Sequence, residues 1–434
     1  MKRKHYKTFY LLSIISLVVA CSKPAANQTP SIETGLVNTS HLDLLYTPVT
    51  FSTGTKAAGI YIYCEAPDYH LVEAAGEGFT CVDDVARAAQ VYLRSSKFSS
   101  DTAVQGKVFN LIRFLLEMQS DNGYFYNFVF TSGLINKAGV TSINNPNWWS
   151  WRALQTLTEA APLIQNMDAQ LYSQIEAAVN NLVTQIKVDL VNLPQTTKEV
   201  NGITIPQWLP AGSGTDQAAL LILGLIPYCL NTGDAVITEY VKKLADGVAM
   251  MQAGDSTQYP YACFLSWENT WHAYGNIQAY ALLRAGAFLN DPQYTTKAMA
   301  EIDNFYPWLL ANGFKSSFSI AKNGNTYQTL TDKDYEQIAY GISPMVFAAI
   351  EAYKMNGQDK YADLAGQLAA WFLGANDAGV NMYDISTGRC YDGIISASSV
   401  NYNSGAESTI EALLALQNVE NYPSVKAALD KYKK

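Results

Sequence analysis

The feature that most constrains this chain is a repeated pair of helical segments. The first members of the pairs begin about 50 to 70 residues apart, near Asp83, Trp149, Asp216, Glu268, Glu336 and Ala406. They are apolar on every side, as in residues 216–230, so each must be buried all round. The second members are amphipathic, as in residues 236–251, with an apolar face opposite a charged one. Six buried helices alternating with six half-exposed ones predict two concentric rings.

Over residues 75–434 this pattern resembles the six-hairpin, or (α/α)6 toroid, glycosidase superfamily. The resemblance implies an all-α toroid of six helical hairpins, which would form a single domain over residues 41–434. Residues 41–70 are expected to be a short β-rich segment leading into it. Pro344 lies inside one of the buried helical segments, where it predicts a kink or a break.

Residues 1–21 have the features of a lipoprotein signal peptide. Four cationic residues precede an apolar stretch, residues 9–20, that is too short for a permanent membrane span. The stretch ends in a sequence that resembles a bacterial lipobox, and this implies lipidation of Cys21 and display on the cell envelope, facing the periplasm or the cell surface. Residues 22–40 are expected to be a flexible tether.

Charge and cysteine spacing narrow the classes of partner. The net charge is −9 and there is no basic stripe, which argues against nucleic acid as a partner. The five cysteines after Cys21 show no CxxC spacing, so neither a zinc site nor a full disulfide framework is predicted, although one disulfide remains open. No nucleotide-binding or HExxH motif occurs, and we expect no cofactor and no metal; only Asp384 and Asp392 leave calcium open.

Loop lengths predict which end of the toroid carries the site. Connections that enter a buried helix are long, and those that leave one are short. Long ordered loops in a compact domain are usually functional. Alternating aromatic residues in 123–130 and 379–394 also resemble β-hairpins. If the two kinds of helix run antiparallel, all these loops surround the N-termini of the inner helices.

The residues predicted at this face are carboxylates and aromatic rings. Aromatic faces suit the CH-rich faces of pyranose rings, and two carboxyl groups with separated pKa values can supply the acid and base of glycosidic hydrolysis. The candidates are Asp83, Asp84, Trp149, Arg152, Trp208, Asp216, Trp267, Glu268, Trp271, His272, Tyr335, Glu336, Asp392 and Glu407.

Some of these acids also have a structural explanation. Helix dipoles favour acids in the first turn, and Thr80–Asp83, Asp334–Gln337 and Ser404–Glu407 have the spacing of capping boxes. Asp83 and Asp84 point about 100° apart, so we assign Asp83 to the helix start, where it can also contact substrate, and Asp84 to the cavity. Glu407 is expected to cap its helix and to contact substrate.

Catalytic roles are predicted for Asp84, Glu268 and Glu336. Glu268 lies between Trp267 and Trp271, whose rings would raise its pKa by desolvation and keep it protonated as a general acid. We therefore expect Glu268 or Glu336 to be the acid and Asp84 the base.

Three functions remain open. The first is a glycoside hydrolase, whose mechanism the resemblance implies to be inverting, with two well-separated carboxylates. The second is a polysaccharide lyase, which Arg152 and His272 permit, although an acid-rich face disfavours an anionic substrate. The third is a non-catalytic glycan-binding lipoprotein. Epimerases of similar fold generally use paired histidines, and the repeat region contains only His272. We expect a carbohydrate substrate, a membrane contact through Cys21, no nucleic acid, and a monomer.

Overall fold

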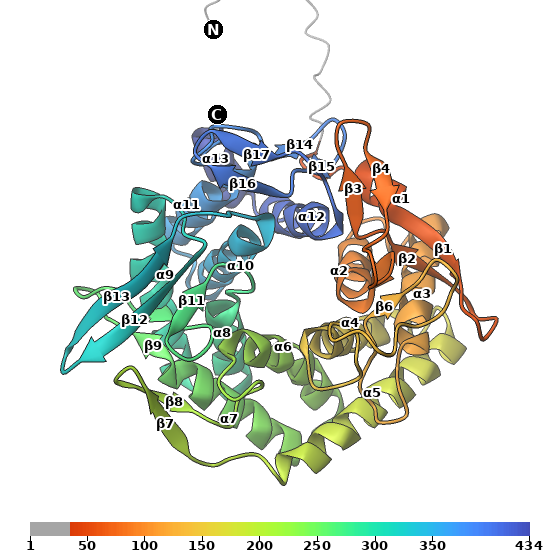
Figure 1. Ribbon diagram of the computed structural model, residues 1–434, viewed down its shortest axis with the longest axis horizontal. Helices are drawn as coiled ribbons and strands as arrows, with labels where there is room; N and C mark the ends of the chain where they lie inside the picture. The colour runs from red at the N-terminus through yellow and green to blue at the C-terminus, as the bar shows by residue number, and fades with distance from the viewer. Residues whose placement is uncertain (1–34) are drawn as a thin grey trace, which may run out of the picture. The chain divides into compact units, whose positions relative to one another are not determined.

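The computed structural model describes residues 35–434, of which residues 36–434 form one compact body. This body is a closed double ring of helices (Figure 1). The inner helices are α2 (Val82–Leu93), α4 (Trp148–Ile164), α6 (Thr215–Thr232), α8 (Gln278–Leu289), α10 (Ala339–Asn356) and α12 (Ala406–Glu420). The outer helices are α3 (Thr102–Glu117), α5 (Ala169–Leu190), α7 (Ala235–Met250), α9 (Pro292–Asn312), α11 (Asp359–Ala369) and α13 (Pro423–Tyr432).

The two rings differ in burial as the sequence predicts. Every residue of α6 from Thr215 to Ile226 is buried, because this helix has neighbours on all sides. Only one face of α7 is buried, which leaves its charged side chains to solvent. Each inner helix packs against the next, and α12 packs against α2 to close the ring, where the Gln417 side-chain amide donates to the Val91 carbonyl at 2.9 Å.

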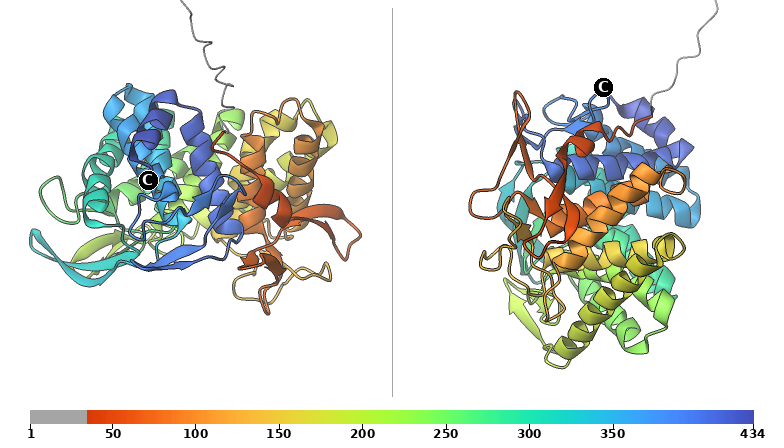
Figure 2. Two further views of the ribbon diagram at one scale, coloured as in Figure 1. Left: turned by 90° about the horizontal axis from the view of Figure 1, so that it is seen from above. Right: turned by 90° about the vertical axis from the view of Figure 1, so that its right-hand side faces the viewer.

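The connections are short at one end of the ring and long at the other. Short turns lead from inner to outer helices, and aspartates cap four of the outer helices by accepting backbone N–H groups, namely Asp101, Asp168, Asp234 and Asp291. All strands lie in the N-terminal segment or in the long connections. Figure 2 shows them gathered along one side of the helical ring.

The N-terminal segment, where a β-rich lead-in is expected, contains a short helix and two hairpins. It comprises α1 (Ser40–Leu45), β1 (Tyr46–Thr50) paired with β2 (Lys56–Ile60), β3 (Tyr63–Glu65) paired with β4 (His70–Val72), and β5 (Thr80–Cys81), which pairs with β6 (Phe128–Val129). Leu36 is buried and the Val37 N–H donates to Glu420 at 3.3 Å. The compact body therefore starts at Leu36, inside the segment expected to be tether.

The long connections contain the remaining strands. They are β7 (Thr197–Val200) with β8 (Ile203–Pro206), β9 (Gln252–Ala253) with β10 (Cys263–Phe264), the three-stranded sheet of β11 (Thr270–His272), β12 (Ser317–Asn323) and β13 (Thr326–Lys333), β14 (Tyr383–Asp384) with β15 (Arg389–Cys390), and β16 (Gly393–Ser396) with β17 (Ser399–Asn401). A 3-10 helix, η1 (Ala370–Leu373), ends the fifth hairpin. The hairpin predicted in residues 379–394 is confirmed, whereas residues 123–130 contribute only β6.

One prediction about a helix start is wrong, and of the kink or break expected at Pro344 the break does not occur. The helix expected near Glu268 begins at Gln278, because Thr270–His272 pair with β12 and Gly275 adopts a φ of +68° that interrupts the chain before the helix. Pro344 does not break α10, which continues from Ala339 to Asn356.

The predicted capping boxes are also wrong. Thr80 lies in β5, where its hydroxyl accepts from the Ile60 N–H, and the N-cap of α2 is Cys81. The N-cap of α12 is Gly405 and makes no side-chain hydrogen bond, so Glu407 is not part of a capping box. The segment Asp334–Gln337 precedes the start of α10.

The cysteines after Cys21 carry no disulfide. Cys64, Cys81, Cys229, Cys263 and Cys390 are all buried free thiols. The signal peptide and Cys21 lie outside the described residues. Among residues 35–434, no helix combines the length and the apolar character needed to cross a bilayer.

Candidate functional site

A cluster of carboxylates surrounds Arg87 at the centre of the ring, where the inner helices begin. Its guanidinium contacts Asp83 (2.8 Å), Asp84 (2.7 Å) and Glu407 (3.2 Å) through Nη2, and Glu411 (2.8 Å) through Nη1. The contacts join α2 to α12 across the closure of the ring. Asp83, Asp84 and Arg87 reach one another because residues three and four apart on a helix share a face.

A second guanidinium, Arg152 on α4, completes this Arg87 cluster. Its Nε lies 2.6 Å from Asp83 Oδ1, and its Nη2 donates to the Tyr340 hydroxyl on α10. Both guanidiniums lie over the Tyr340 ring, at 5.2 Å for Arg87 and 4.9 Å for Arg152. These are cation–π distances, so the phenol ring stabilises both guanidiniums.

The cluster holds more carboxylates than cations, and this affects Glu407 most. Burial in the ring raises the pKa of Glu407 to about 7; Arg87 opposes the shift, and repulsion from Asp84, Glu411 and Asp83 adds to it. Its side chain nevertheless keeps 43% of its surface accessible. Glu407 therefore combines a proton held near neutral pH with access to solvent at the end of the ring where the inner helices begin. We call this end, with Asp83 and Glu407, the mouth of the ring.

The two aspartates at the start of α2 differ in access. The Asp83 side chain is 22% exposed, whereas that of Asp84 is 6% exposed. The second oxygen of Asp84 lies 3.3 Å from the Cys81 thiol, and burial raises the pKa of this carboxyl. Asp83 is thus the aspartate with access to the mouth, whereas Asp84 is buried and forms an ion pair with Arg87.

Asp216 and His272 form a separate pair at the same face. Asp216 Oδ2 lies 3.1 Å from His272 Nε2, and burial raises the pKa of the aspartate while His272 opposes that shift. The other ring nitrogen of His272 binds the Tyr274 carbonyl at 2.8 Å, and the two rings stack at 3.7 Å. Both nitrogens of the imidazole are therefore occupied by protein groups.

The loop that carries Tyr274 also contacts the cluster. A Cβ on Gly275 would lie 2.9 Å from both the Trp148 ring and the Tyr340 hydroxyl, so only glycine permits this approach. The Tyr274 side chain is exposed. The mouth is thus bordered by carboxylates on the α2 and α12 side and by aromatic rings on the α4 and α8 side.

Other predicted site residues lie at the rim of the same face. Trp267 is exposed and its indole N–H donates to the Ala211 carbonyl. Glu268 forms an ion pair with Lys198 at 2.7 Å, and it is not enclosed by two indole rings as predicted, because Trp271 turns into the core. Glu336 is exposed beside Gly393.

Several predicted residues have structural partners instead. Trp271 is fully buried against Phe305 and Phe318. The indole N–H groups of Trp149 and Trp208 donate to the Phe125 and Lys243 carbonyls.

Two further candidates make hydrogen bonds within the protein. Tyr335 donates to Asp377, and Asp392 accepts from the Gly405 N–H and the Ser408 hydroxyl, which fixes the start of α12 beside Glu407. Within residues 35–434, no group of three or more His, Cys, Asp or Glu side chains is arranged to hold a metal ion.

Sequence reasoning missed three members of the cluster: Arg87, Glu411 and Tyr340. A usable signal was present, since Arg87 and Glu411 are charged residues in helices that are otherwise buried all round, and such charges are almost always paired. Glu411 also accepts a hydrogen bond from the Ser343 hydroxyl of α10, so three inner helices meet at this carboxylate.

Comparison with known proteins adds evidence at the level of fold. No family profile and no curated protein sequence matches the chain. Among solved structures, a sugar epimerase from a ruminal bacterium matches with a TM-score of 0.59 and 11% identity, covering 84% of this chain and 92% of that one. A cellobiose 2-epimerase from Bacillus thermoamylovorans matches with a TM-score of 0.57, 12% identity and the same coverage.

A cellulase of C. cellulolyticum matches with a TM-score of 0.50 and 10% identity, covering 85% of this chain and 89% of that one. Identities this low establish architecture and leave the reaction open. The closed ring of six helical hairpins and these matches agree, and the chain has the six-hairpin glycosidase-like (α/α)6 toroid fold.

Proposed function

We propose that this protein is a carbohydrate-active enzyme that hydrolyses a glycosidic bond, with Glu407 as the general acid. The observation that carries the proposal is the Glu407 carboxyl group, which is 43% exposed and lies 3.2 Å from Arg87 in a cluster with three further acids. Burial and these acids raise its pKa to about 7. A glycoside hydrolase must protonate the leaving oxygen, and a carboxylic acid that stays protonated near neutral pH can do so. The structural matches support a carbohydrate substrate, since they include a cellulase and sugar epimerases.

Asp83 is the nearest second carboxylate with access to the mouth. Asp83 Oδ2 and Glu407 Oε2 both bind Nη2 of Arg87, at 2.8 and 3.2 Å, so these two oxygens are no more than 6.0 Å apart. Retaining glycosidases separate their carboxyl groups by about 5–5.5 Å and inverting ones by about 6.5–9.5 Å. If Asp83 is the partner, the spacing favours retention.

Inversion requires a base outside the Arg87 cluster. Glu336 is an exposed carboxylate in the connection that enters α10, so solvent water reaches it. The sequence-based proposal of an inverting mechanism therefore depends on Glu336 or another rim carboxylate such as Glu268, with Glu407 as the acid.

The contacts of His272 and of the arginines disfavour two other reactions. Proton abstraction by His272, as in an epimerase, would require one of its nitrogens to leave Asp216 or the Tyr274 carbonyl. Neutralisation of a uronate, as in a lyase, would require Arg87 or Arg152 to exchange a carboxylate partner for the substrate. Carboxylate-based hydrolysis needs neither change.

A glycan panel with product detection by NMR tests the proposal. We expect new reducing ends from at least one glycan, loss of turnover in Glu407→Gln, and a first-formed anomer that assigns retention or inversion. Loss in Asp83→Asn with retained activity in Glu336→Gln supports the close pair, and the reverse supports inversion. Epimerised sugar without hydrolysis, an unsaturated product, or binding without turnover would each overturn the proposal.

We also propose that Cys21 anchors the protein in the cell envelope as a lipoprotein and that the body acts as a monomer. Mass spectrometry of the N-terminal peptide from cells would show a lipidated Cys21, and Cys21→Ser should release the protein from the membrane fraction. A soluble wild-type protein of unmodified mass would contradict the anchor, and light scattering of the detergent-solubilised protein tests the monomer.

A further inference from the structure

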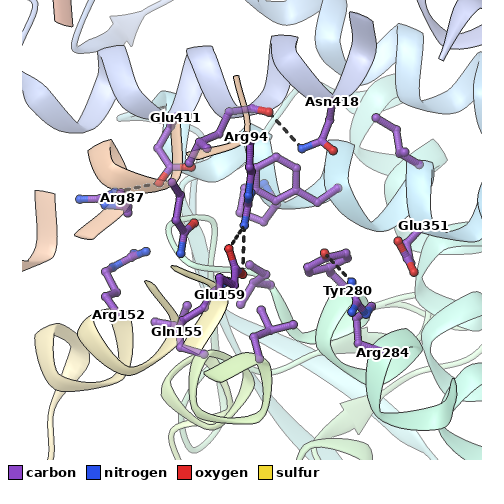
Figure 3. Close-up of a pocket in the computed structure, with 18 of the residues that line it drawn as sticks. Arg87, Arg94, Arg152, Gln155, Glu159, Tyr280, Arg284, Glu351, Glu411 and Asn418 are labelled. Carbon is purple, nitrogen blue, oxygen red and sulfur yellow. Dashed lines mark hydrogen bonds and ion pairs between the residues drawn. The ribbon is translucent and has the colours of Figure 1, made fainter. Parts of the chain in front are cut away.

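A cavity of about 310 Å³ lies inside the inner ring, behind the Arg87 cluster (Figure 3). Arg87, Arg152, Tyr340 and Glu411 form the end nearest the candidate site. This rear cavity extends from there to Arg94 and Lys354, at the C-terminal ends of α2 and α10. Its volume is within the range of small-molecule pockets.

The rear cavity opens away from the candidate site. The side chains of Arg94 and Lys354 are 34% and 40% exposed, so solvent reaches this end of the ring. At the other end, hydrogen bonds of the Arg87 cluster span the lumen, from Arg87 to Glu411 and from Arg152 to Tyr340. A ligand would therefore enter from the face opposite the mouth.

Among the described residues that line the rear cavity, Arg284 is a cation with no carboxylate oxygen in ion-pair contact. Arg94 pairs with Glu159 at 2.9 Å, and Lys354 pairs with Glu351 at 2.6 Å. The half-buried Arg284 guanidinium has only a long hydrogen bond of 3.4 Å to the Tyr280 hydroxyl (Figure 3). In the part of the chain that the structure describes, no carboxylate oxygen lies within 4.0 Å of it.

The helix dipole explains why Arg94 and Lys354 lie at the C-terminal ends of their helices, but it does not explain the position of Arg284. Basic residues are favoured in the last turn of a helix, where Lys354 lies, and Arg94 is the C-cap of α2. Arg284 lies more than one turn before the end of α8 at Leu289, beyond the reach of this effect. Burial disfavours the charge of Arg284, and Tyr280, Glu351 and Glu159 outweigh this and raise its pKa. Because Glu159 and Glu351 already form ion pairs with Arg94 and Lys354, an anion in the cavity would give Arg284 a partner of its own.

The lining determines the kind of anion. At the end of the cavity away from the candidate site, the three cations Arg94, Arg284 and Lys354 face two acids, Glu159 and Glu351, and this excess of one positive charge matches a monoanion. The planar guanidinium matches the two oxygens of a carboxylate. Leu223, Ile226 and Phe347 line the same cavity and give it apolar surface. Phe347 and Tyr280 are neighbouring rings, with centroids 6.1 Å apart. Carboxylate and apolar contacts together suit a small acid with a hydrocarbon body.

We propose that the rear cavity binds a small monocarboxylate with an apolar or aromatic body, whose carboxylate pairs with Arg284. Binding there does not require turnover at the mouth, so this inference stands or falls separately from the proposed hydrolysis.

Calorimetric titration of the full chain in detergent with sodium benzoate tests it. We expect saturable one-to-one binding that weakens about tenfold or more in Arg284→Gln, because a charge-assisted hydrogen bond is lost. The matched control is Arg113→Gln, which removes an exposed arginine from the outer helix α3 and should leave binding unchanged. Benzyl alcohol, which lacks the charge, should not bind.

Three results would overturn the proposal: no saturable benzoate binding by the wild type, equal binding by Arg284→Gln, or sulfate binding as tightly as benzoate. Should Arg284→Gln fail to fold, labelling of the wild type with phenylglyoxal decides. Benzoate should then protect Arg284 and leave Arg113 reactive, and unprotected labelling of Arg284 would contradict the site.

Discussion

At the residue scale, the different surroundings of Asp83 and Glu407 determine their chemistry. Asp83 receives two guanidiniums, Arg87 and Arg152, whereas Glu407 receives only Arg87, at a longer distance. Glu407 also faces the negative charges of Asp84 and Glu411. Glu407 therefore has weaker compensation than Asp83 has, and with burial this raises its pKa to about 7, so it retains a proton near neutral pH as a general acid must.

The raised pKa of Glu407 predicts a pH dependence of turnover. Since the pKa of Glu407 is about 7, the protonated form is lost as pH rises through neutrality, and kcat/KM should fall about tenfold per pH unit above that value. Glu407→Gln should lower turnover by about 10²–10⁴-fold. A rate profile from pH 5 to 9 measures both effects. The control is Glu239→Gln on the exposed face of α7, and a flat wild-type profile through pH 8.5 would contradict the role of Glu407.

Arg87 predicts a second effect, on stability. A lysine presents one compact charge and cannot reach four carboxylates, so Arg87→Lys should lower the free energy of unfolding by about 3–5 kcal/mol at pH 8. The deficit should shrink at pH 5, where the released carboxylates can take up protons. Urea unfolding at the two pH values measures it, with Arg113→Lys as the exposed control. Equal deficits at both pH values would show that the charges in the cluster are not coupled through Arg87.

The sequence could locate these acids but could not pair them. Asp83, Asp84 and Glu407 were predicted at inner helix starts, because apolar periodicity shows where such helices begin. Glu411, one of the two partners of Arg87 on α12, is separated from it by 324 residues, and no local sequence pattern predicts that contact. The capping-box spacing of Glu407 was misleading for the same reason, since a distant guanidinium provides its partner.

At the element scale, the predicted starts of the inner helices are correct where no strand from a distant part of the chain pairs with the first turn. Five of the six inner helices begin within three residues of the predicted position. The exception is α8, whose expected first turn is instead strand β11. This strand pairs with β12, which lies in the connection between α9 and α10. Aromatic and β-branched residues such as Thr270 and Trp271 fit either structure, and the long-range partner decides.

Packing between outer helices predicts the effect of one methyl group. A Cβ on Gly366 of α11 would lie 2.4 Å from Ala428 Cβ and 2.6 Å from the Leu429 nitrogen of α13. Gly366→Ala must therefore push the two helices apart and should destabilise the protein by about 1–3 kcal/mol.

Gly106 of α3 is the matched control, because nothing lies within 4 Å of a Cβ there. Gly106→Ala should stabilise by about 0.5–1 kcal/mol through helix propensity. Urea unfolding of both variants measures the difference. A neutral or stabilising Gly366→Ala would contradict the close approach of α11 and α13.

At the scale of the whole molecule, ring closure determines where chemistry can occur. The inner helices are parallel, so their N-termini and the long connections collect at one face, while the short turns occupy the other. Polar side chains remain inside the lumen because six helices cannot bring their axes together at one point. The Arg87 cluster contributes Arg87 and Glu411 to the lining of the rear cavity, while its Glu407 side chain is 43% exposed.

Global stability should depend on pH through Glu301 of α9. This side chain is buried, accepts from the Phe264 N–H at 2.8 Å and from Tyr306, and burial raises its pKa from 4.5 to about 8. Between these values the folded protein holds a proton that the unfolded chain has lost. The free energy of unfolding should therefore fall as pH rises from 4.5 to 8, by up to about 1.4 kcal/mol per pH unit from this group.

Glu301→Gln isolates that contribution. The amide carbonyl can still accept from Phe264, and no proton is bound or lost, so the variant should show a shallower decline and gain stability relative to wild type toward pH 8. Urea unfolding at half-unit steps from pH 5 to 8.5 measures both slopes, and Glu239→Gln should reproduce the wild-type curve. Parallel curves for wild type and Glu301→Gln would mean that Glu301 is ionised in the folded protein over this pH range. That result would contradict the raised pKa of this carboxyl group.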